Sequence, residues 1–239
     1  ATAVERGWWS SDSGPFNFAD AYSRGDRSDG SGAMRRKRSC TVLSAGSGGI
    51  ETTSMMALLR DHSDAVNAAE PFRTDLTGKG ICIHFDDGPK GGNTAASLVS
   101  DLCADGSRLP IHWCSFYSPC LAPFFPVFIE GTLPSALAIG GEHATPDSPW
   151  WLFVQLAHLI RQDAPGRIAD VRACWAQLEA EWLASAYPLA ARARQMIDNG
   201  DTKEAHALLS EYMKDAVEQM LNTAERLITQ FSATSVAAG

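Results

Sequence analysis

Cysteines and histidines offer the most reactive side chains in this sequence, and some of them occur in close pairs. A single residue separates Cys82 from His84, and a single residue separates His112 from Cys114. On a strand, residues i and i+2 project from the same face, so each pair presents two potential metal ligands. No set of four ligands at a known spacing accompanies either pair, and apolar flanks are more typical of core positions. We therefore expect neither a metal site nor a cofactor.

A cysteine nucleophile needs a nearby base and surroundings that stabilise its thiolate. Cys82, Cys114 and Cys120 have apolar neighbours in the sequence, which raise a thiol pKa and reduce its reactivity. The run Arg60-Asp61-His62 contains the right residue types for catalysis, but consecutive side chains diverge on one helical turn. The sequence also lacks a G-x-S-x-G elbow, a Walker loop and a dinucleotide-binding fingerprint. No complete active site is therefore evident from spacing.

The bulk composition restricts the classes of protein that remain. The 239 residues are 45% hydrophobic and 20% charged, which is typical of a globular chain with a sizeable core. The net charge of -8 argues against nucleic-acid and anionic-membrane partners, because both require a basic face. No apolar run approaches a membrane span. No charged-then-apolar segment opens the sequence, so we expect no secretory signal. The six cysteines are too sparse for a disulfide scaffold, so we expect reduced thiols and a cytoplasmic location.

Short strands and a helix should position these residues between 51 and 140. Thr52 or Thr53 is expected to cap a helix that runs towards His62. Strands are expected over residues 81–85, 94–102, 110–116 and 124–129, the last of them at an edge because of its prolines. Short strands joined by turns predict an antiparallel sheet, and so an α+β fold.

The two ends of the chain differ in character. Residues 1–50 show little periodicity, and they include an expected flexible loop at 28–32 and a basic run at 35–38 that we interpret as a solvated face. Residues 147–231 are expected to be helical, with breaks at Pro165-Gly166 and Asn199-Gly200 and a kink or end at Pro188. We therefore divide the chain into a mixed α/β part at 1–146, with a long N-terminal loop region, and helices at 147–239 that pack on it.

Several segments, in order, resemble the secernins and related cysteine dipeptidases. These segments are Gly7-Trp8-Trp9, Phe16-Asn17-Phe18, Leu58-Leu59-Arg60-Asp61-His62, Gly80-Ile81-Cys82-Ile83-His84, Thr94-Ala95-Ala96-Ser97, Ser118-Pro119-Cys120 and Ser148-Pro149-Trp150-Trp151. The resemblance implies half of an αββα sandwich of the N-terminal-nucleophile hydrolases. It also implies cleavage of small peptide or amide bonds by an N-terminal cysteine whose own α-amine, with a pKa near neutrality, acts as the base.

The chain itself begins with Ala1-Thr2, so the resemblance assigns it no catalytic residue. The nucleophile is expected on a partner chain that corresponds to the N-terminal half of the family. Asn93, Thr94 and Ser97 are candidates for hydrogen bonds to a substrate, because they match a family segment. Arg60 is a candidate for binding a substrate carboxylate, and His84 is a weaker candidate.

Three alternatives remain open from the sequence. The chain could be a secernin-like interaction protein that has lost hydrolysis, or an acyl-transferring relative of the hydrolases. Residues 147–231 could instead form a helical binding module by themselves. The expected absence of a nucleophile is compatible with each of these alternatives, so sequence alone does not choose among them.

Overall fold

The structure is a computed structural model, and it describes residues 2–22, 31–62, 80–83, 92–162 and 164–237. His84, most of the loop expected at 28–32 and part of the strand expected at 81–85 lie outside these ranges. Helices and an antiparallel sheet make up the described residues, so the expected α+β class is confirmed. None of the described helices combines the length and apolar character that crossing a membrane requires.

The sheet has three antiparallel strands in the order β1-β2-β3. Strand β1 is Ala96–Asp101, β2 is Ile111–Phe116 and β3 is Phe125–Val127. Three of the expected strands are therefore present, although each is shorter than expected. Pro126 lies in β3, which is an edge strand, and there its missing N–H breaks no ladder hydrogen bond on the outer side.

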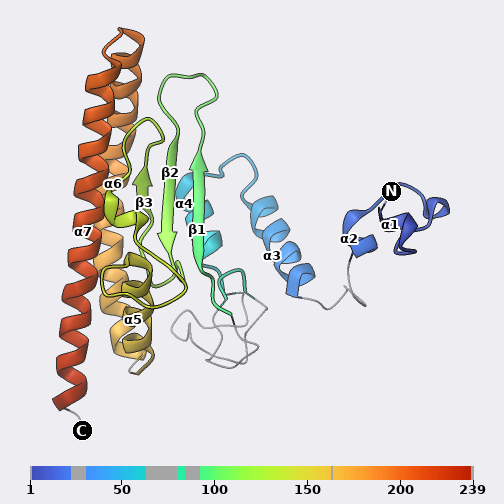
Figure 1. The fold of residues 1–239 in the computed structure, drawn as a ribbon, viewed down its shortest axis with the longest axis horizontal. Helices are drawn as coiled ribbons and strands as arrows, with labels where there is room; N and C mark the ends of the chain where they lie inside the picture. The colour runs from blue at the N-terminus through green and yellow to red at the C-terminus, as the bar shows by residue number, and fades with distance from the viewer. Residues whose placement is uncertain (1, 23–30, 63–79, 84–91, 163, 238–239) are drawn as a thin grey trace.

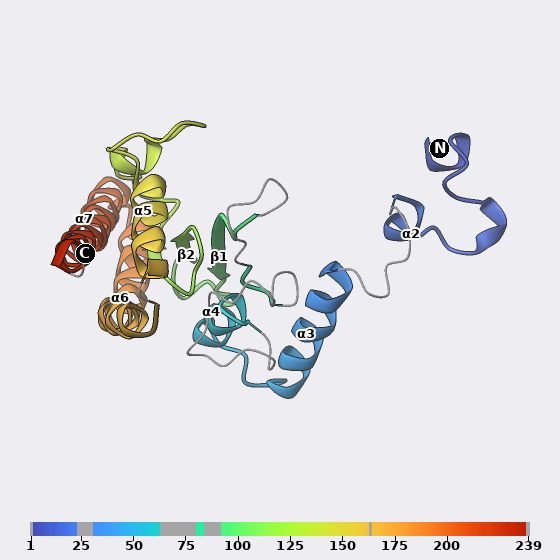
Figure 2. The same cartoon turned by 90° about the horizontal axis from the view of Figure 1, so that it is seen from below.

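The two faces of the sheet pack against different helices. Helix α4 (Thr52–Leu59) lies on the face that carries Val99 and Asp101, and Asp101 Oδ2 accepts a hydrogen bond from Thr52 of that helix. Helix α5 (Pro149–Gln162) reaches the other face, where its Phe153 lies against Phe116 of β2. Figure 2 shows α4 on one side of the strands and the bundle of α5, α6 and α7 beyond β2.

The C-terminal helices form a bundle with an apolar interior. Helices α6 (Ala164–Asp198) and α7 (Thr202–Ala237) run side by side along most of their lengths (Figure 1). Gly200 joins them at φ 93°, a left-handed conformation that favours glycine, so the C-cap expected at Asn199-Gly200 is confirmed. Residues of α5, α6 and α7 belong to the same buried cluster as the sheet, which places one continuous core under both parts of the chain.

Pro188 does not end its helix, although the sequence predicted a kink or an end there. It lies inside α6, which continues to Asp198. A proline inside a helix removes one backbone hydrogen bond, but Ala186, Ala190 and Ala193 beside it are completely buried. Burial of this alanine face against its neighbours holds the helix together across the proline. The break expected at Pro165-Gly166 falls slightly earlier, because α5 ends at Gln162 and α6 begins at Ala164. Both Pro165 and Gly166 therefore lie in the first turn of α6.

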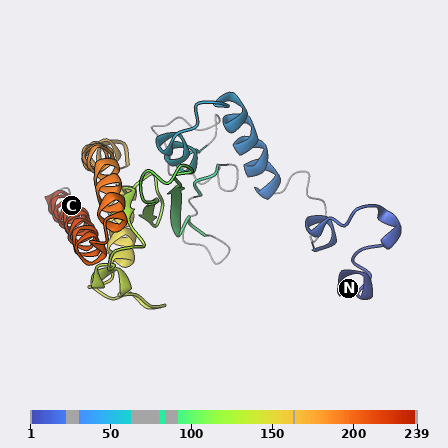
Figure 3. The same cartoon turned by 90° about the horizontal axis from the view of Figure 1, so that it is seen from above.

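The N-terminal 50 residues hold more helix than their weak periodicity predicted. Helices α1 (Thr2–Glu5), α2 (Phe18–Tyr22) and α3 (Ser31–Ala45) and a 3-10 turn at Ser11–Ser13 occupy much of this region. The basic run at 35–38 lies within α3. A further 3-10 turn covers Ser135–Ala138. Figures 1 and 3 show α1 and α2 at a distance from the sheet, with α3 between them and the rest of the chain.

Two local expectations near the sheet are also corrected. The helix cap is Glu51, not Thr52 or Thr53, because Glu51 and Ser54 form a reciprocal capping box. Residues 81–83 form no strand, since the Ile81 and Cys82 N–H groups both bond to the carbonyl oxygen of Asp61. The short apolar run is therefore a turn that folds back on the end of α4.

Candidate functional site

Three potential metal ligands lie close together, one from the end of α4, one from the turn at 80–83 and one from the loop after β2. His62, Cys82 and Cys120 each place one ligand atom within 4.8 Å of the other two. The two sulfur atoms are 3.8 Å apart, and both cysteines are buried. The three residues are far apart in the sequence, so the fold alone brings them together. They are the group with this geometry among the residues that the structure describes.

The end of α4 and the turn at 80–82 hold His62 and Cys82 in place. The Asp61 carbonyl accepts hydrogen bonds from the N–H groups of Ile81 and Cys82, at 2.9 and 3.0 Å. Gly80 approaches the main chain closely, because a Cβ there would lie 2.9 Å from the Cα of His62. The Asp61 side chain pairs with Arg38 of α3. The turn, α3 and the end of α4 are thus tied together at Asp61.

Cys120 lies in a loop that leaves β2 through an unusual backbone conformation. Tyr117 has φ 55°, a left-handed value that is uncommon for a residue with a large side chain. Its N–H bonds to the Ala95 carbonyl, and the N–H of Leu121 closes a turn on Ser118. Strained backbone of this kind persists where the surrounding structure imposes it, and it is concentrated at functional sites. The turn directs the buried Cys120 towards Cys82.

An ion pair between Arg60 and Glu179 contacts the loop that contains Cys120. Arg60 donates to both Glu179 oxygens and to the carbonyls of Pro119 and Ala122. Glu179 also accepts from the N–H of Phe124 at 2.6 Å. The Arg60 guanidinium lies over the Phe124 ring. This pair therefore satisfies backbone groups on both sides of Cys120 and restricts the position of the loop.

Burial controls the protonation of the thiols. Desolvation raises the pKa of the Cys120 thiol well above its usual range, and the neighbouring Cys82 raises it further. The positive charges of Arg172 and Arg60 oppose this shift but do not cancel it. Desolvation also raises the pKa of Cys114, to about 11. Burial thus raises the pKa of both thiols, in the direction that their apolar neighbours in the sequence predicted.

Two cavities adjoin the Arg60–Glu179 pair. One, of about 210 Å³, is lined by Cys120, Arg172 and Ala176 together with the pair. The other, of about 400 Å³, is lined by Thr53, Met56 and Leu183 with Arg60, Arg172 and Glu179. Arg60, Arg172 and Glu179 line both cavities, so the walls carry charges of both signs.

The residues that the sequence nominated for substrate binding fall into two places. Arg60 lies in the ion pair with Glu179, beside the loop that contains Cys120. Asn93 and Thr94 precede β1, and Ser97 lies in that strand, opposite Ser115 of β2. Asn93 accepts a hydrogen bond from Arg161, and the Thr94 hydroxyl accepts one from the N–H of Ile83. The Thr94 contact joins the two places, because Ile83 directly follows Cys82. His84 lies outside the described residues.

The second sequence pair, His112 and Cys114, projects from one face of β2 as expected. His112 Nδ1 hydrogen-bonds to the Ser100 hydroxyl, and the Cys114 thiol lies 4.0 Å from the His112 carbonyl. No third potential ligand joins them within the described ranges. This pair is part of the sheet surface.

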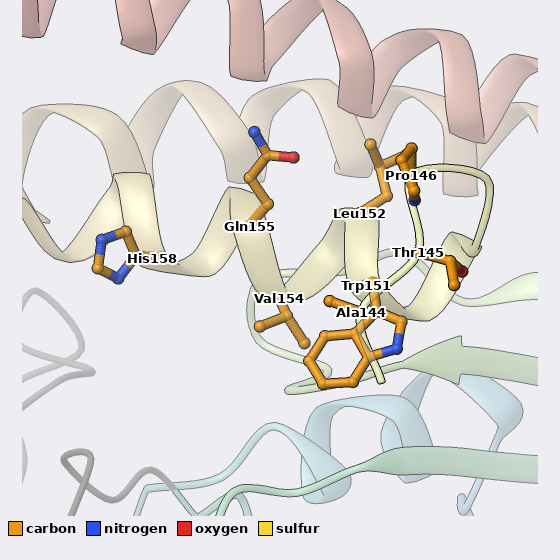
Figure 4. A pocket seen from close by; sticks show the side chains of 8 residues that line it. All are labelled: Ala144, Thr145, Pro146, Trp151, Leu152, Val154, Gln155 and His158. Carbon is orange, nitrogen blue, oxygen red and sulfur yellow. The ribbon is translucent and has the colours of Figure 1, made fainter. Parts of the chain in front are cut away.

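A separate cavity of about 490 Å³ lies on the outer side of α5 (Figure 4). Its walls are mostly apolar, and Trp151, Val154 and His158 project from the helix towards it. The polar side chains in its lining are Thr145, Gln155 and His158. The lining therefore offers a hydrophobic surface but no pair of groups suited to acid–base chemistry.

Sequence reasoning missed the cluster of His62, Cys82 and Cys120. It noted each residue within a separate motif, but the distances along the chain match no known ligand spacing. The available signal was weak: a glycine or proline that permits a tight turn precedes each cysteine, namely Gly80 and Pro119. Only the return of the chain at 80–83 to the end of α4 reveals the group.

Comparison of the chain with models of protein families, with curated proteins and with solved structures finds no match.

Proposed function

We propose that this chain is a subunit of a secernin-like, cysteine-dependent N-terminal-nucleophile hydrolase that cleaves dipeptide-like amide bonds, with the nucleophile on a partner chain. In this proposal the sheet β1-β2-β3 is part of an αββα sandwich that the partner completes. The partner corresponds to the N-terminal half of the family, and its first residue is the reacting cysteine. The ordered family-like segments supply the reaction class.

The observation that carries the proposal is the incomplete cover of β1. Leu98 lies on the same face as Phe116, but it is 57% exposed whereas Phe116 is packed against α5. Leu102 directly after the strand is 69% exposed. The outer edge of β1 pairs with no strand among the described residues. An exposed edge with apolar side chains is suited to pairing with a further strand.

The N-terminal arm offers a second apolar surface for such a partner. Trp8, Phe16, Phe18 and Tyr22 are exposed. The Tyr22 ring contacts those of Trp8 and Phe18, and the Phe16 ring contacts that of Trp9. Aromatic side chains dominate the energetics of protein interfaces because they bury a large apolar area. An arm at a distance from the core that carries these rings fits a segment that packs on another polypeptide (Figure 1).

Within such an enzyme, this chain would contribute to the substrate pocket. Asn93, Thr94 and Ser97 lie together at the start of β1. The free carboxylate of a small peptide would enter the cavities beside Arg60 and Arg172, where Arg172 would bind it and Arg60 stays paired with Glu179. The partner's cysteine would perform the attack on the carbonyl carbon.

The test combines capture of the partner with activity. An affinity-tagged chain is expressed in its native cells, the co-purified polypeptide is sequenced from its N-terminus, and the complex is assayed with unblocked dipeptides such as alanyl-alanine. We expect the partner to begin with cysteine, the complex to hydrolyse the dipeptides and the isolated chain to be inert. Hydrolysis by the isolated chain, an inert complex, or a partner that begins with a residue other than cysteine would contradict the proposal.

Two surface variants locate the interface. Leu98→Asp places a charge on the open face of β1, so it should reduce both partner capture and activity. Ile139→Asp, at a half-exposed apolar position outside the sheet, serves as the matched control and should leave both unchanged. Equal capture by the Leu98→Asp chain would exclude this face as the docking surface.

A further inference from the structure

We propose that His62, Cys82 and Cys120 bind a divalent transition metal, with Zn²⁺ as the ion that fits best. The site belongs to this chain alone, so it does not depend on the hydrolase proposal. It also differs from the expectation drawn from sequence, which was that the chain holds no metal. The geometry of the three ligand atoms, the charge balance of the site and the chemical nature of the ligands all favour such an ion.

The distance between the two sulfur atoms matches a tetrahedral zinc site. With Zn–S bonds of about 2.3 Å and tetrahedral angles, two sulfur ligands of one ion lie about 3.8 Å apart. The Cys82 and Cys120 sulfurs are 3.8 Å apart. A disulfide would require about 2.05 Å. The two sulfurs can therefore bind one ion as they stand.

His62 completes a set of three ligands. Its nearer ring nitrogen lies within 4.8 Å of both sulfurs, whereas ligation requires a nitrogen to sulfur distance of about 3.6 Å. His62 lies just after α4, which ends at Leu59, and ligation would require its ring to move closer to the two sulfurs. Its backbone is meanwhile fixed against Gly80 by the hydrogen bonds to Asp61.

The charges favour an ion in this buried position. Each thiol would release its proton to solvent as its sulfur binds, so two thiolates would neutralise the +2 charge of the ion. The resulting group is neutral overall, which lowers the cost of placing it among buried residues. Cys82 and Cys120 are only 3% and 4% exposed, so their thiols are poorly placed as nucleophiles but well placed as ligands.

The ligand types select the metal. Two thiolates and an imidazole are soft or borderline ligands, which suit Zn²⁺ and Co²⁺ and disfavour Mg²⁺ and Ca²⁺. Three protein ligands leave one coordination position for water or another small ligand, as in catalytic zinc sites. The cavity of about 210 Å³ beside Cys120 would offer space for that ligand.

A bound ion would also tie together three segments that are remote in the sequence. These are the end of α4 at His62, the turn at Cys82 and the loop after β2 at Cys120. Since the structural hydrogen bonds of Asp61 and Arg60 already hold these segments near one another, the ligands are largely in place before the ion binds.

The experiment is titration of the full chain with Co²⁺ after reduction and removal of metal by a chelator. We expect one ion per chain, with a sulfur-to-cobalt charge-transfer band and the intense visible bands of tetrahedral coordination. Addition of Zn²⁺ should abolish these bands by displacement. X-ray absorption of the Zn²⁺-loaded chain should then show two sulfur ligands at about 2.3 Å. This last measurement needs no variant and therefore does not depend on how a substitution folds.

Matched cysteine variants identify the ligands. Cys82→Ser and Cys120→Ser should each remove at least half of the charge-transfer intensity and weaken Co²⁺ binding more than 100-fold. His62→Ala should weaken binding at least 10-fold but retain the charge-transfer band. Cys114→Ser, which removes a half-buried thiol from β2, should change neither property.

Three outcomes would overturn the proposal. The first is the absence of tetrahedral Co²⁺ bands in the reduced chain. The second is an equal loss of binding in Cys114→Ser. The third is a Cys82–Cys120 disulfide, detected by peptide mapping of chain purified under reducing conditions. Because these measurements use the isolated chain and no substrate, their failure is distinguishable from failure of the hydrolase proposal.

Discussion

The α6–α7 hairpin and the loops around Cys120 hold together in different ways. The helices bury a continuous apolar stripe in which Leu209, Met213 and Met220 are completely covered. The loops depend on polar contacts, chiefly those of Arg60 and Glu179 with backbone groups on either side of Cys120. A stripe distributes its stability over many small contacts, whereas the loops concentrate theirs in a few groups. Substitutions in the two regions should therefore have different consequences.

The largest effect is expected from a cavity in the helical region. Leu209→Ala removes a fully buried side chain from α7 and should lower the free energy of unfolding by about 3–4 kcal/mol. Because Leu209 is not one of the proposed metal ligands, the Co²⁺ affinity of the folded chain should not change. Denaturant unfolding and metal titration measure the two quantities. Glu211→Ala, at an exposed position of the same helix, should stay within about 0.5 kcal/mol of the native chain.

Loss of the Glu179 carboxylate should affect both stability and the site. In Glu179→Ala, the Arg60 guanidinium and the N–H of Phe124 both lose an acceptor, so the free energy of unfolding should fall by about 3 kcal/mol. The loop that carries Cys120 would also be released, so Co²⁺ binding should weaken at least 10-fold. Glu181→Ala, on the exposed side of α6, is the matched control. An unchanged Co²⁺ affinity in Glu179→Ala would show that the pair does not position the loop.

A single methyl group at Gly80 tests the close packing of the turn against α4. In Gly80→Ala the new Cβ would meet the Cα of His62 at 2.9 Å, so one of the two backbone segments must move. We expect a loss of about 2 kcal/mol in unfolding free energy, together with weaker Co²⁺ binding. Gly92→Ala, where the added methyl meets nothing within 4 Å, should preserve both. Equal behaviour of the two variants would mean that the turn is free to shift without affecting the ligands.

The contrast between the regions also explains what sequence could predict. The stripe of α7 repeats every three or four residues, so its buried face can be read directly from the sequence. Three short strands were recognisable for the same reason, since local patterns determine them. Pro188 misled because tertiary burial of the flanking alanines outweighs the local cost of a proline. Local rules describe a segment but not the forces that its neighbours apply.

The sequence could not predict the group formed by His62, Cys82 and Cys120, for a related physical reason. His62, Cys82 and Cys120 come together because Asp61 accepts two N–H groups from the turn and because Arg60 binds the loop at Pro119. Neither contact leaves a periodic signal, since each joins single residues that are distant along the chain. The role expected of Arg60, which is to bind a substrate carboxylate, stays a prediction, and the structure places its guanidinium against Glu179.

The smallest effect concerns the joint between the sheet and the helices, where Asp101 at the end of β1 accepts hydrogen bonds from Thr52 of α4 and Tyr187 of α6. Burial alone would raise the pKa of Asp101, but hydrogen bonds from Tyr187, Thr52 and Arg108 outweigh it and hold the pKa below its usual value. A carboxyl whose pKa is lower in the folded state stabilises the fold above its unfolded pKa of about 3.9. That contribution is lost as the pH falls through the lower, folded value.

The measurement for this joint is the free energy of unfolding as a function of pH in Asp101→Asn and in the native chain. We expect the variant to be less stable at neutral pH and the difference to shrink as the pH falls below about 4. Asp215→Asn, on the exposed side of α7, should follow the native curve throughout. A difference that stays constant down to pH 2 would mean that the charge of Asp101 is irrelevant to the joint. In that case its hydrogen bonds alone, which an asparagine makes incompletely, would connect the sheet to α4 and α6.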